Sequence, residues 1–380
     1  MIRNPVRLAL FFLLFIVLSG CAHRLTGPNY AADDRPWIAE GISDPDFEIH
    51  VHHRVLMIGD AGYYLEDDPT LEALGQWADS VDSSSVLFLG DNIYNEGLTD
   101  DDREHGERIL GQQLAATEVR KIFIPGNHDW GLFPRDHNAQ SIRNQQAFVD
   151  EWPAGHAEFI PKEGCMGPVS RVLAEASGSQ KAVVFIALDP TPWINERLRE
   201  DCPTSQTQEE FLDALDALLT QHRDDLVVLG SHYPLLTGGP HGGLSYGFIG
   251  DMIVTPLGWI AGGLGNTYET DYADWIERMQ VVLRRNPPAI YTAGHDHSLQ
   301  LLDAGDVAGM YLVSGAGARE RVSTVTNLPE TFFAHAAPGF LVVDFGERAG
   351  SNVVIVRVIE AGVPDPVFEM EIQPLGRADF

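Results

Sequence analysis

Short apolar runs alternate with amphipathic stretches along the chain from Arg54 onward. Six runs are nearly continuous, as in strands that are buried on both faces: Val55–Ile58, Val86–Leu89, Ile122–Ile124, Ala182–Leu188, Leu226–Leu229 and Ala289–Tyr291. Four later runs show the alternation of a second sheet face: Met310–Val313, Phe340–Phe345, Val353–Ile359 and Val367–Ile372. Strands with helical patterns between them predict a domain of the α/β class.

Two amphipathic helices are expected between these strands. The first carries an apolar stripe at helical spacing, made of Phe211, Leu212, Leu215, Leu218 and Leu219. Thr207 and Glu210 have the spacing of a capping box at its start. The second stripe is made of Trp275, Met279, Val282 and Leu283. The prolines of Asn286-Pro287-Pro288 would end this helix, so both stripes are interpreted as packing surfaces.

The N-terminal residues form a secretory signal. Arg3 and Arg7 form a positively charged region before an apolar run over Leu8–Leu18, which is too short for a comfortable membrane span. Leu18-Ser19-Gly20-Cys21 resembles a bacterial lipoprotein processing site, which implies cleavage before Cys21 and lipidation of that cysteine. Together with Ala22, this resemblance favours the outer membrane, with the domain facing the periplasm or the cell surface. An ordinary signal peptide with an incidental cysteine is the alternative.

The chain therefore divides into a signal peptide over residues 1–20, a lipidated Cys21 with a polar tether to residue 53, and a domain over residues 54–380. The tether is expected to be irregular because it is polar and contains several prolines. His50, His52 and His53, at its end, are expected at the surface or on an edge strand.

The charge excludes one class of function. Lys and Arg total 25 against 55 Asp and Glu, a formal net charge of −30, which argues against a nucleic-acid-binding patch. Such a chain also repels anionic substrates unless bound metal ions reverse the local field.

Two cysteines remain after Cys21. Export would place Cys165 and Cys202 in an oxidising compartment, so they are expected to form a disulfide; two unpaired thiols are the alternative.

Metal-binding side chains follow five of the apolar runs, each shortly after a glycine. They are Asp60, Asp91, Asn127, His128, His232, His295 and His297, with Tyr94 three positions after Asp91. Because strand carboxyl ends share one edge of an α/β sheet, these side chains are expected to converge there. Mixed oxygen and imidazole donors suit iron, manganese or zinc. One such stretch alone is typical of a turn, but five in order predict a metal cluster.

These stretches resemble the calcineurin-like metallophosphoesterases, and among them the purple acid phosphatases of the small tartrate-resistant branch. The matching stretches are Gly90-Asp91-Asn92-Ile93-Tyr94, Gly126-Asn127-His128-Asp129, His232-Tyr233-Pro234, Gly294-His295-Asp296-His297-Ser298-Leu299-Gln300 and Ser314-Gly315-Ala316-Gly317. The likeness covers roughly residues 54–345. It implies a four-layer α/β/β/α sandwich of two mixed sheets.

The first two stretches distinguish the purple acid phosphatase type. Most of the superfamily has Asp-x-His in the first stretch, but here Gly62 stands in place of the histidine. Tyr94 occupies the position where purple acid phosphatases have a tyrosinate ligand to ferric iron. The resemblance therefore implies iron. A manganese or zinc enzyme, in which the Tyr94 hydroxyl does not touch the metal, is the alternative.

The resemblance also implies a dinuclear site. Fe(III) would be bound by Asp60, Tyr94 and His297. A divalent Fe, Zn or Mn ion would be bound by Asn127, His232 and His295, and Asp91 would bridge the two ions.

Two further histidines receive catalytic roles from the same resemblance. His128 would hydrogen-bond the substrate or protonate the leaving oxygen, with Asp129 orienting its ring. His241, in a glycine-rich loop, is the looser match, and an ordinary loop histidine is the alternative.

The implied activity is that of a metal-dependent phosphoric ester hydrolase, foremost a phosphomonoesterase of the acid phosphatase type, in which water activated by two metal ions attacks phosphorus. The ligand set equally fits a phosphodiesterase or a nucleotide pyrophosphohydrolase, and a non-catalytic surface lipoprotein is a third alternative. Specificity would lie in loops such as Gly242–Tyr268, interpreted as an insertion that forms a lid, a membrane-facing loop or a buried loop. The expected partners are a small phosphate ester and, through the anchor, the membrane.

Overall fold

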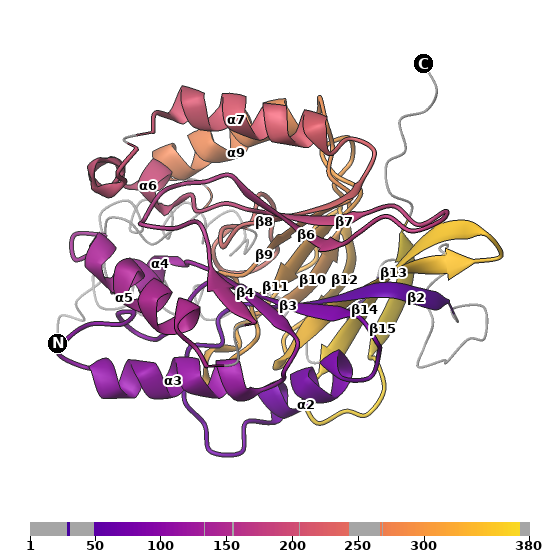
Figure 1. The fold of residues 1–380 in the computed structure, drawn as a ribbon, viewed down its shortest axis with the longest axis horizontal. Coiled ribbons are helices and arrows are strands. Elements are labelled where there is room, and N and C mark those ends of the chain that lie inside the picture. Colours follow the sequence, from indigo (N-terminus) through magenta and orange to yellow (C-terminus); the bar gives the residue numbers. More distant parts are fainter. Residues whose placement is uncertain are drawn as a thin grey trace, which may run out of the picture.

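Two β-sheets pack face to face between layers of helices (Figure 1). The computed structural model describes residues 29–30 and 49–372, except 133, 154–155, 205, 243–266 and 268. The expected signal peptide, Cys21, most of the tether and nearly all of Gly242–Tyr268 lie outside the described residues. In the part of the chain that is described, no helix is long and apolar enough to cross a membrane.

Seven of the described strands form the first sheet. Their order is β15 (Phe368–Ile372), β14 (Ser351–Glu360), β13 (Gly339–Arg348), β2 (His50–Ile58), β3 (Ser84–Leu89), β4 (Arg120–Ile124) and β5 (Ala157–Phe159). β2 to β5 are parallel, whereas β13 pairs antiparallel with both β2 and β14. The carboxyl ends of β2, β3 and β4 therefore meet at one edge of this sheet.

The second sheet has eight strands among the described residues. Their order is β1 (Asn29–Tyr30), β12 (Thr331–His335), β10 (Leu299–Leu302), β11 (Tyr311–Ser314), β9 (Ile290–Ala293), β8 (Leu226–Gly230), β7 (Val183–Ala187) and β6 (Val169–Ala174). β7, β8, β9 and β11 are parallel, and the other pairings are antiparallel. Both sheets are mixed, as expected.

Helices cover the outer face of each sheet (Figure 1). The seven-stranded sheet is covered by α2 (Pro69–Ala78), α3 (Arg103–Ala115) and α5 (Ala139–Asp150). The eight-stranded sheet is covered by α6 (Thr191–Ile194), α7 (Gln208–Gln221) and α9 (Thr270–Leu283). This confirms the expected α/β/β/α sandwich.

Alternate residues of each central strand serve different layers. In β2, Val55 and Met57 enter the core between the sheets, while Leu56 and Ile58 pack against the helices. All four are fully buried, because strands in a sheet covered on both faces have no solvent side. This explains why such strands appear in the sequence as unbroken apolar runs.

Both expected helices are present with the expected ends. α7 begins with a capping box in which the Glu210 backbone N–H donates to Thr207 Oγ1 (3.2 Å) and the Thr207 N–H donates to Glu210 Oε2 (2.9 Å). α9 ends at Leu283, shortly before the two prolines. The apolar stripes of both helices lie in one cluster under the eight-stranded sheet.

Regular structure begins before residue 54, the expected start of the domain. β2 begins at His50 and pairs with β13 from its first residue, and Asn29–Tyr30 already pair with β12. The expectation of a surface or edge strand was wrong for His53, because β2 lies between β13 and β3 and His53 is only 2% exposed. Its ring nitrogens contact Ser83 Oγ (2.8 Å) and Ser85 Oγ (3.2 Å). Burial, aided by the charges of His52 and Arg120, lowers the pKa of His53 to about 4, so a polar partner and a neutral ring let it occupy an interior strand.

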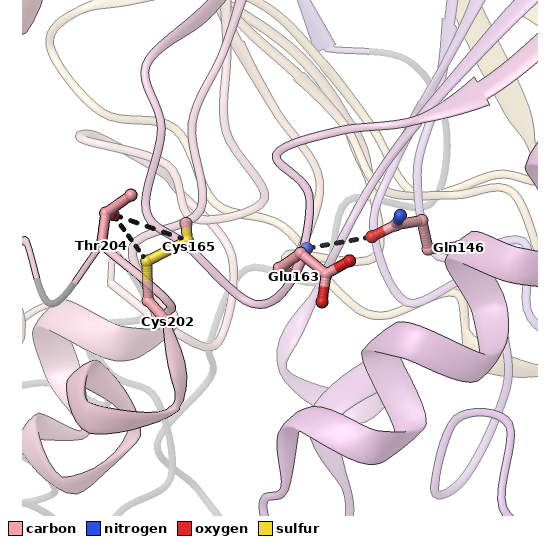
Figure 2. The surroundings of a disulfide bond; sticks show 5 residues. All are labelled: Gln146, Glu163, Cys165, Cys202 and Thr204. Carbon is pink, nitrogen blue, oxygen red and sulfur yellow. Dashed lines mark hydrogen bonds between the residues drawn. A yellow bond between two sulfur atoms is a disulfide. The ribbon is translucent and has the colours of Figure 1, made fainter.

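Cys165 and Cys202 form a disulfide, with their Cα atoms 4.8 Å apart (Figure 2). Cys165 lies where the chain crosses from β5, an edge of one sheet, to β6, an edge of the other. Cys202 follows the 3-10 helix η2 (Glu196–Asp201), which continues from α6. The bond therefore ties the crossover to the segment that follows α6.

Candidate metal centre

Five strand ends bring metal-binding side chains to one edge of the sandwich. β2, β3 and β4 of the seven-stranded sheet lead into Asp60, Asp91 and Asn127, respectively. β8 of the other sheet leads into His232, and β9 leads into both His295 and His297. All five strands are parallel to their neighbours among these, so their carboxyl ends lie together, as the sequence predicted.

Three of these residues have a backbone that L-residues rarely adopt. The φ angles of Asp60, Asp91 and His295 are 59°, 52° and 68°, in the left-handed region. Hydrogen bonds hold the turns in place: the Asp60 N–H donates to Gly90 O (2.9 Å), and the His295 N–H donates to Asp60 Oδ2 (2.8 Å). Such strain persists only where the surroundings fix it, and it concentrates at functional sites.

Asp60, Tyr94 and His297 form one tight group of donor atoms. Tyr94 Oη lies 2.8 Å from Asp60 Oδ1 and 3.3 Å from His297 Nε2, and the latter two atoms are 3.3 Å apart. Three side chains from three different loops thus place their ligand atoms in mutual contact.

A second group surrounds His232. Its Nε2 lies 3.1 Å from Asn127 Oδ1, 3.2 Å from His295 Nδ1 and 3.4 Å from Asp91 Oδ1. Ligand atoms of Asp60, Asp91 and His232 all lie within 4.8 Å of one another, so the two groups adjoin. Asp91 lies between them.

The donor atoms of both groups fit cations. His232 Nδ1 contacts Leu89 O (2.8 Å), to which it can only donate, so Nε2 presents a lone pair unless the ring is protonated. That nitrogen faces a carboxylate, an amide oxygen and another imidazole nitrogen, an arrangement of acceptors that a positive ion would stabilise.

The electrostatics of the metal-free cluster point the same way. Burial, the largest single effect, opposes a charge on both His232 and Asp91. Their mutual attraction, together with the neighbouring charges and hydrogen bonds, outweighs burial, which raises the pKa of His232 and lowers that of Asp91. Burial and the charges of Asp60 and Asp91 raise the pKa of Tyr94 well above its usual value. Protons therefore neutralise the cluster where no metal ion does, and a tyrosinate there requires a cation.

Asp129 fastens the loops that carry the ligands. Its carboxylate accepts the backbone N–H groups of Gly126 (2.7 Å), Asn92 (2.9 Å) and Ile93 (3.2 Å). The expectation that Asp129 orients His128 was wrong, because its carboxylate accepts these three backbone groups and also Asn92 Nδ2 (3.0 Å), all from the loops after β3 and β4. The His128 ring is held instead by Asn95 O, to which its Nδ1 donates at 2.7 Å.

His128 and His241 both line a cavity of about 580 Å³ over the cluster, together with Asp91, His295 and His297. The His241 ring stacks near that of His295, with centroids 4.1 Å apart, and its Nδ1 is buried without a hydrogen-bond partner among the described residues. Asp296 holds the His241 loop, because its Oδ1 accepts the His241 N–H (3.1 Å) and its Oδ2 accepts the Thr237 hydroxyl (2.5 Å). The structure thus brings the loosely matched His241 to the same site as the other residues.

A histidine has no room at position 62. A Cβ added to Gly62 would lie 2.6 Å from Asp91 O and 2.8 Å from Tyr94 N. The Tyr94 N–H also donates to Gly62 O (2.8 Å). The backbone of the loop that carries Tyr94 therefore fills the place of a side chain at position 62, which limits this position to glycine.

Sequence reasoning missed Arg321. It belongs to the 3-10 helix η3 (Arg319–Arg321) after β11, and it lines the cavity with its guanidinium carbon 4.1 Å from the Tyr94 ring centroid. Only the Ser314-Gly315-Ala316-Gly317 stretch just before it hinted at the site.

Comparisons with known proteins agree with this geometry. The family profile described as Calcineurin-like phosphoesterase matches residues 53–299. Purple acid phosphatase 17 of Arabidopsis thaliana is 21% identical over 308 residues, covering 76% of this chain and 77% of the relative. Purple acid phosphatase 3 of the same plant is 21% identical over 310 residues, covering 77% and 71%. Among solved structures, GAP50, described as the anchor in the inner membrane complex of Plasmodium, aligns with a TM-score of 0.59 at 12% identity, covering 87% of this chain and 91% of that one.

The contact between the loops after β3 and β4 predicts that Gly126→Ala disrupts the site. A Cβ at position 126 would lie 2.3 Å from both the backbone nitrogen and Oδ1 of Asp91, so the loops would have to separate. We expect a loss of roughly 1–3 kcal/mol in the free energy of unfolding and a large loss of bound metal. The control is Gly111→Ala in α3, where the nearest atom, of Trp152, is 3.8 Å away. Equal metal content in the two variants, measured by elemental analysis, would contradict this account.

Proposed function

Since the chain belongs to the calcineurin-like phosphoesterase family, we propose that it is a phosphomonoesterase of the purple acid phosphatase type. The broader statement, that it is a metal-dependent phosphoric ester hydrolase with a dinuclear site, follows from the family and from the two purple acid phosphatase relatives. The observation that carries the proposal is the pair of adjoining donor groups built from five strand ends.

The two donor groups suggest how the ions divide. Asp60, Tyr94 and His297 would hold one ion, and Asn127, His232 and His295 would hold the other. Asp91, between the groups, would bridge them. When bound, such a pair of ions supplies Lewis acidity and an activated water molecule for attack on phosphorus.

The histidines of the cavity would donate a proton to the leaving group and orient the substrate. The Nδ1 of His128 is committed to Asn95 O, so Nε2 is the atom that can face a substrate oxygen and donate a proton to the leaving group. His241, held by Asp296 and stacked beside His295, would hydrogen-bond the phosphoryl group or its leaving oxygen.

The charge of the cavity favours monoesters over nucleoside polyphosphates. Among the described lining residues, Arg321 is the only lysine or arginine, and it lies beside Tyr94. Other lining residues are apolar, such as Leu132 and Ile194, or acidic, such as Glu269 and Asp271. Residues 243–268, of which the structure describes only residue 267, contain no Lys, Arg or His. Apart from Arg321, a second phosphate away from the metals would therefore find no lysine or arginine among the described lining residues. Phosphodiesters have only one phosphate group and therefore need no second cationic partner, so they remain the alternative substrate.

Iron is proposed for the site that contains Tyr94. A buried phenol with a raised pKa becomes a ligand only when a strongly charged cation replaces its proton, and Fe(III) with a hard phenolate is such a combination. Fe, Zn or Mn would serve as the divalent ion.

The enzyme is further proposed to be exported, lipid-anchored through Cys21 and exposed to the periplasm or the cell surface. This rests on the N-terminal sequence alone. Its substrates would then be small phosphate esters outside the cytoplasm.

Asp91→Asn tests the dinuclear site. Because Asp91 contacts the His232 group and adjoins Asp60, we expect the variant to lose metal and at least about 100-fold in activity together. The assay compares para-nitrophenyl phosphate, bis-para-nitrophenyl phosphate and ADP, and the monoester should be cleaved fastest. Asp101→Asn, at an exposed position, is the control. Full activity in Asp91→Asn would refute the assignment, and preferred cleavage of the diester or of ADP would refute the monoesterase.

Tyr94→Phe tests the iron. Wild-type protein loaded with iron and oxidised should show a visible tyrosinate charge-transfer band, which the variant should lack. Tyr63→Phe is a matched control, because its ring lies 5.2 Å from that of Tyr94 but its hydroxyl is outside the donor group. Absence of the band in iron-loaded wild type would show that Tyr94 is not a tyrosinate ligand, although the protein could still be a metal-dependent hydrolase.

Cys21→Ser tests the anchor. We expect the wild-type chain in the membrane fraction of a Gram-negative host and the variant in the soluble fraction, since acyl chains supply the membrane affinity. The same partitioning of both proteins would show that Cys21 carries no anchor.

A further inference from the structure

Arg321 is a cation held by aromatic rings at the edge of the metal centre. Its guanidinium carbon lies 4.1 Å from the centroid of the Tyr94 ring and 5.7 Å from that of Tyr63. The two rings are themselves neighbours, with centroids 5.2 Å apart. A guanidinium over an aromatic face is attracted to it while the N–H groups around its rim stay available to other partners.

The N–H groups of Arg321 lack acceptors in the described part of the chain. Its Nε is buried without a hydrogen-bond partner, and no described carboxylate is paired with the guanidinium. The buried Arg54 and the half-buried Arg357 differ in this respect, because both are paired with Asp344. A buried N–H donor of a charged group that is left unsatisfied is costly, so this arrangement indicates a ligand that supplies the acceptor.

The position of Arg321 indicates that this ligand is an anion bound at the donor groups. It lines the cavity together with His128 and His297, on the side of Tyr94, whose hydroxyl belongs to the first donor group. In a chain with a net charge of −30, it is the only permanent positive charge among the described lining residues. An anion that reaches the donor groups therefore comes within reach of this guanidinium.

We propose that Arg321 is a positioning residue that binds a non-bridging oxygen of the substrate's phosphoryl group. Its fork of N–H donors matches phosphate oxygens, and its charge is independent of pH in the working range. The rings of Tyr94 and Tyr63 hold the guanidinium in place before substrate arrives, which reduces the entropy lost on binding. The proposal rests on the proposed function for the reaction, but the binding of inorganic phosphate tests it without turnover.

The first experiment compares Arg321→Met with Arg319→Met in the metal-loaded, full-length enzyme. Met keeps much of the apolar stem, and Arg319 is an exposed residue of the same turn that does not line the cavity. For Arg321→Met we expect the KM for para-nitrophenyl phosphate and the Kd for inorganic phosphate to rise about 10–100-fold, with metal content unchanged. Arg319→Met should match wild type in all three quantities.

Chemical rescue separates binding from support of the fold. In Arg321→Ala, added ethylguanidinium should restore phosphate affinity in part, because it can occupy the space between the cavity and the two rings. The phosphate affinity of Arg321→Lys should stay below that of the rescued Arg321→Ala variant, since an ammonium group cannot reproduce the paired N–H donors of a guanidinium. A merely structural role would not respond to the added cation.

Two outcomes would overturn the proposal. Phosphate affinity in Arg321→Met within twofold of wild type would show that the guanidinium does not contact phosphate. Loss of metal in that variant would show that Arg321 supports the Tyr94 group instead, and absence of rescue would agree with that. If wild type binds phosphate but cleaves no ester, the proposed function fails while the phosphate affinities still decide the role of Arg321.

Discussion

The cluster of lone-pair acceptors at the sheet edge is the constraint on which the rest of the structure depends. Asp60, Asp91 and His232 are almost fully buried, and their ligand atoms lie within 4.8 Å of one another. Burying such groups together is unfavourable unless a positive charge joins them. The fold therefore has to hold a high-energy arrangement in place until that charge arrives, and the features around the cluster serve this end.

Backbone hydrogen bonds supply most of this restraint. Asp129 accepts three N–H groups from the loops after β3 and β4, and so locks the two loops that carry Asp91 and Asn127. Burial and the charge of Asp91 raise the pKa of Asp129 to about 8 in the metal-free protein. A cation beside Asp91 would relieve part of that repulsion, because it would neutralise the charge that Asp129 faces. Metal binding and loop fixation are therefore coupled through two neighbouring carboxylates.

The sequence predicted the layers and the ligand positions because both follow from local patterns. Buried strands such as Val86–Leu89 are unbroken apolar runs, and the residues that follow their carboxyl ends must converge. His53 and Arg321 escaped prediction for the opposite reason. The hydroxyl partners of His53 and the tyrosine rings around Arg321 come from other segments, so no local pattern marks either residue. The role of Asp129 was misjudged because proximity in sequence to His128 says nothing of which N–H groups its side chain reaches.

The left-handed turns at Asp60 and Asp91 bear on how such a domain can change over evolutionary time. At φ angles of 59° and 52°, asparagine and glycine fit as well as aspartate, whereas glutamate or a branched residue adds strain. The substitutions that best preserve the fold are thus the ones that remove the charge. A lineage released from selection for hydrolysis would drift toward Asn or Gly at these two positions and keep its architecture. In a homologous sequence, the residues at these two turns therefore distinguish an enzyme from a scaffold that has lost its metals.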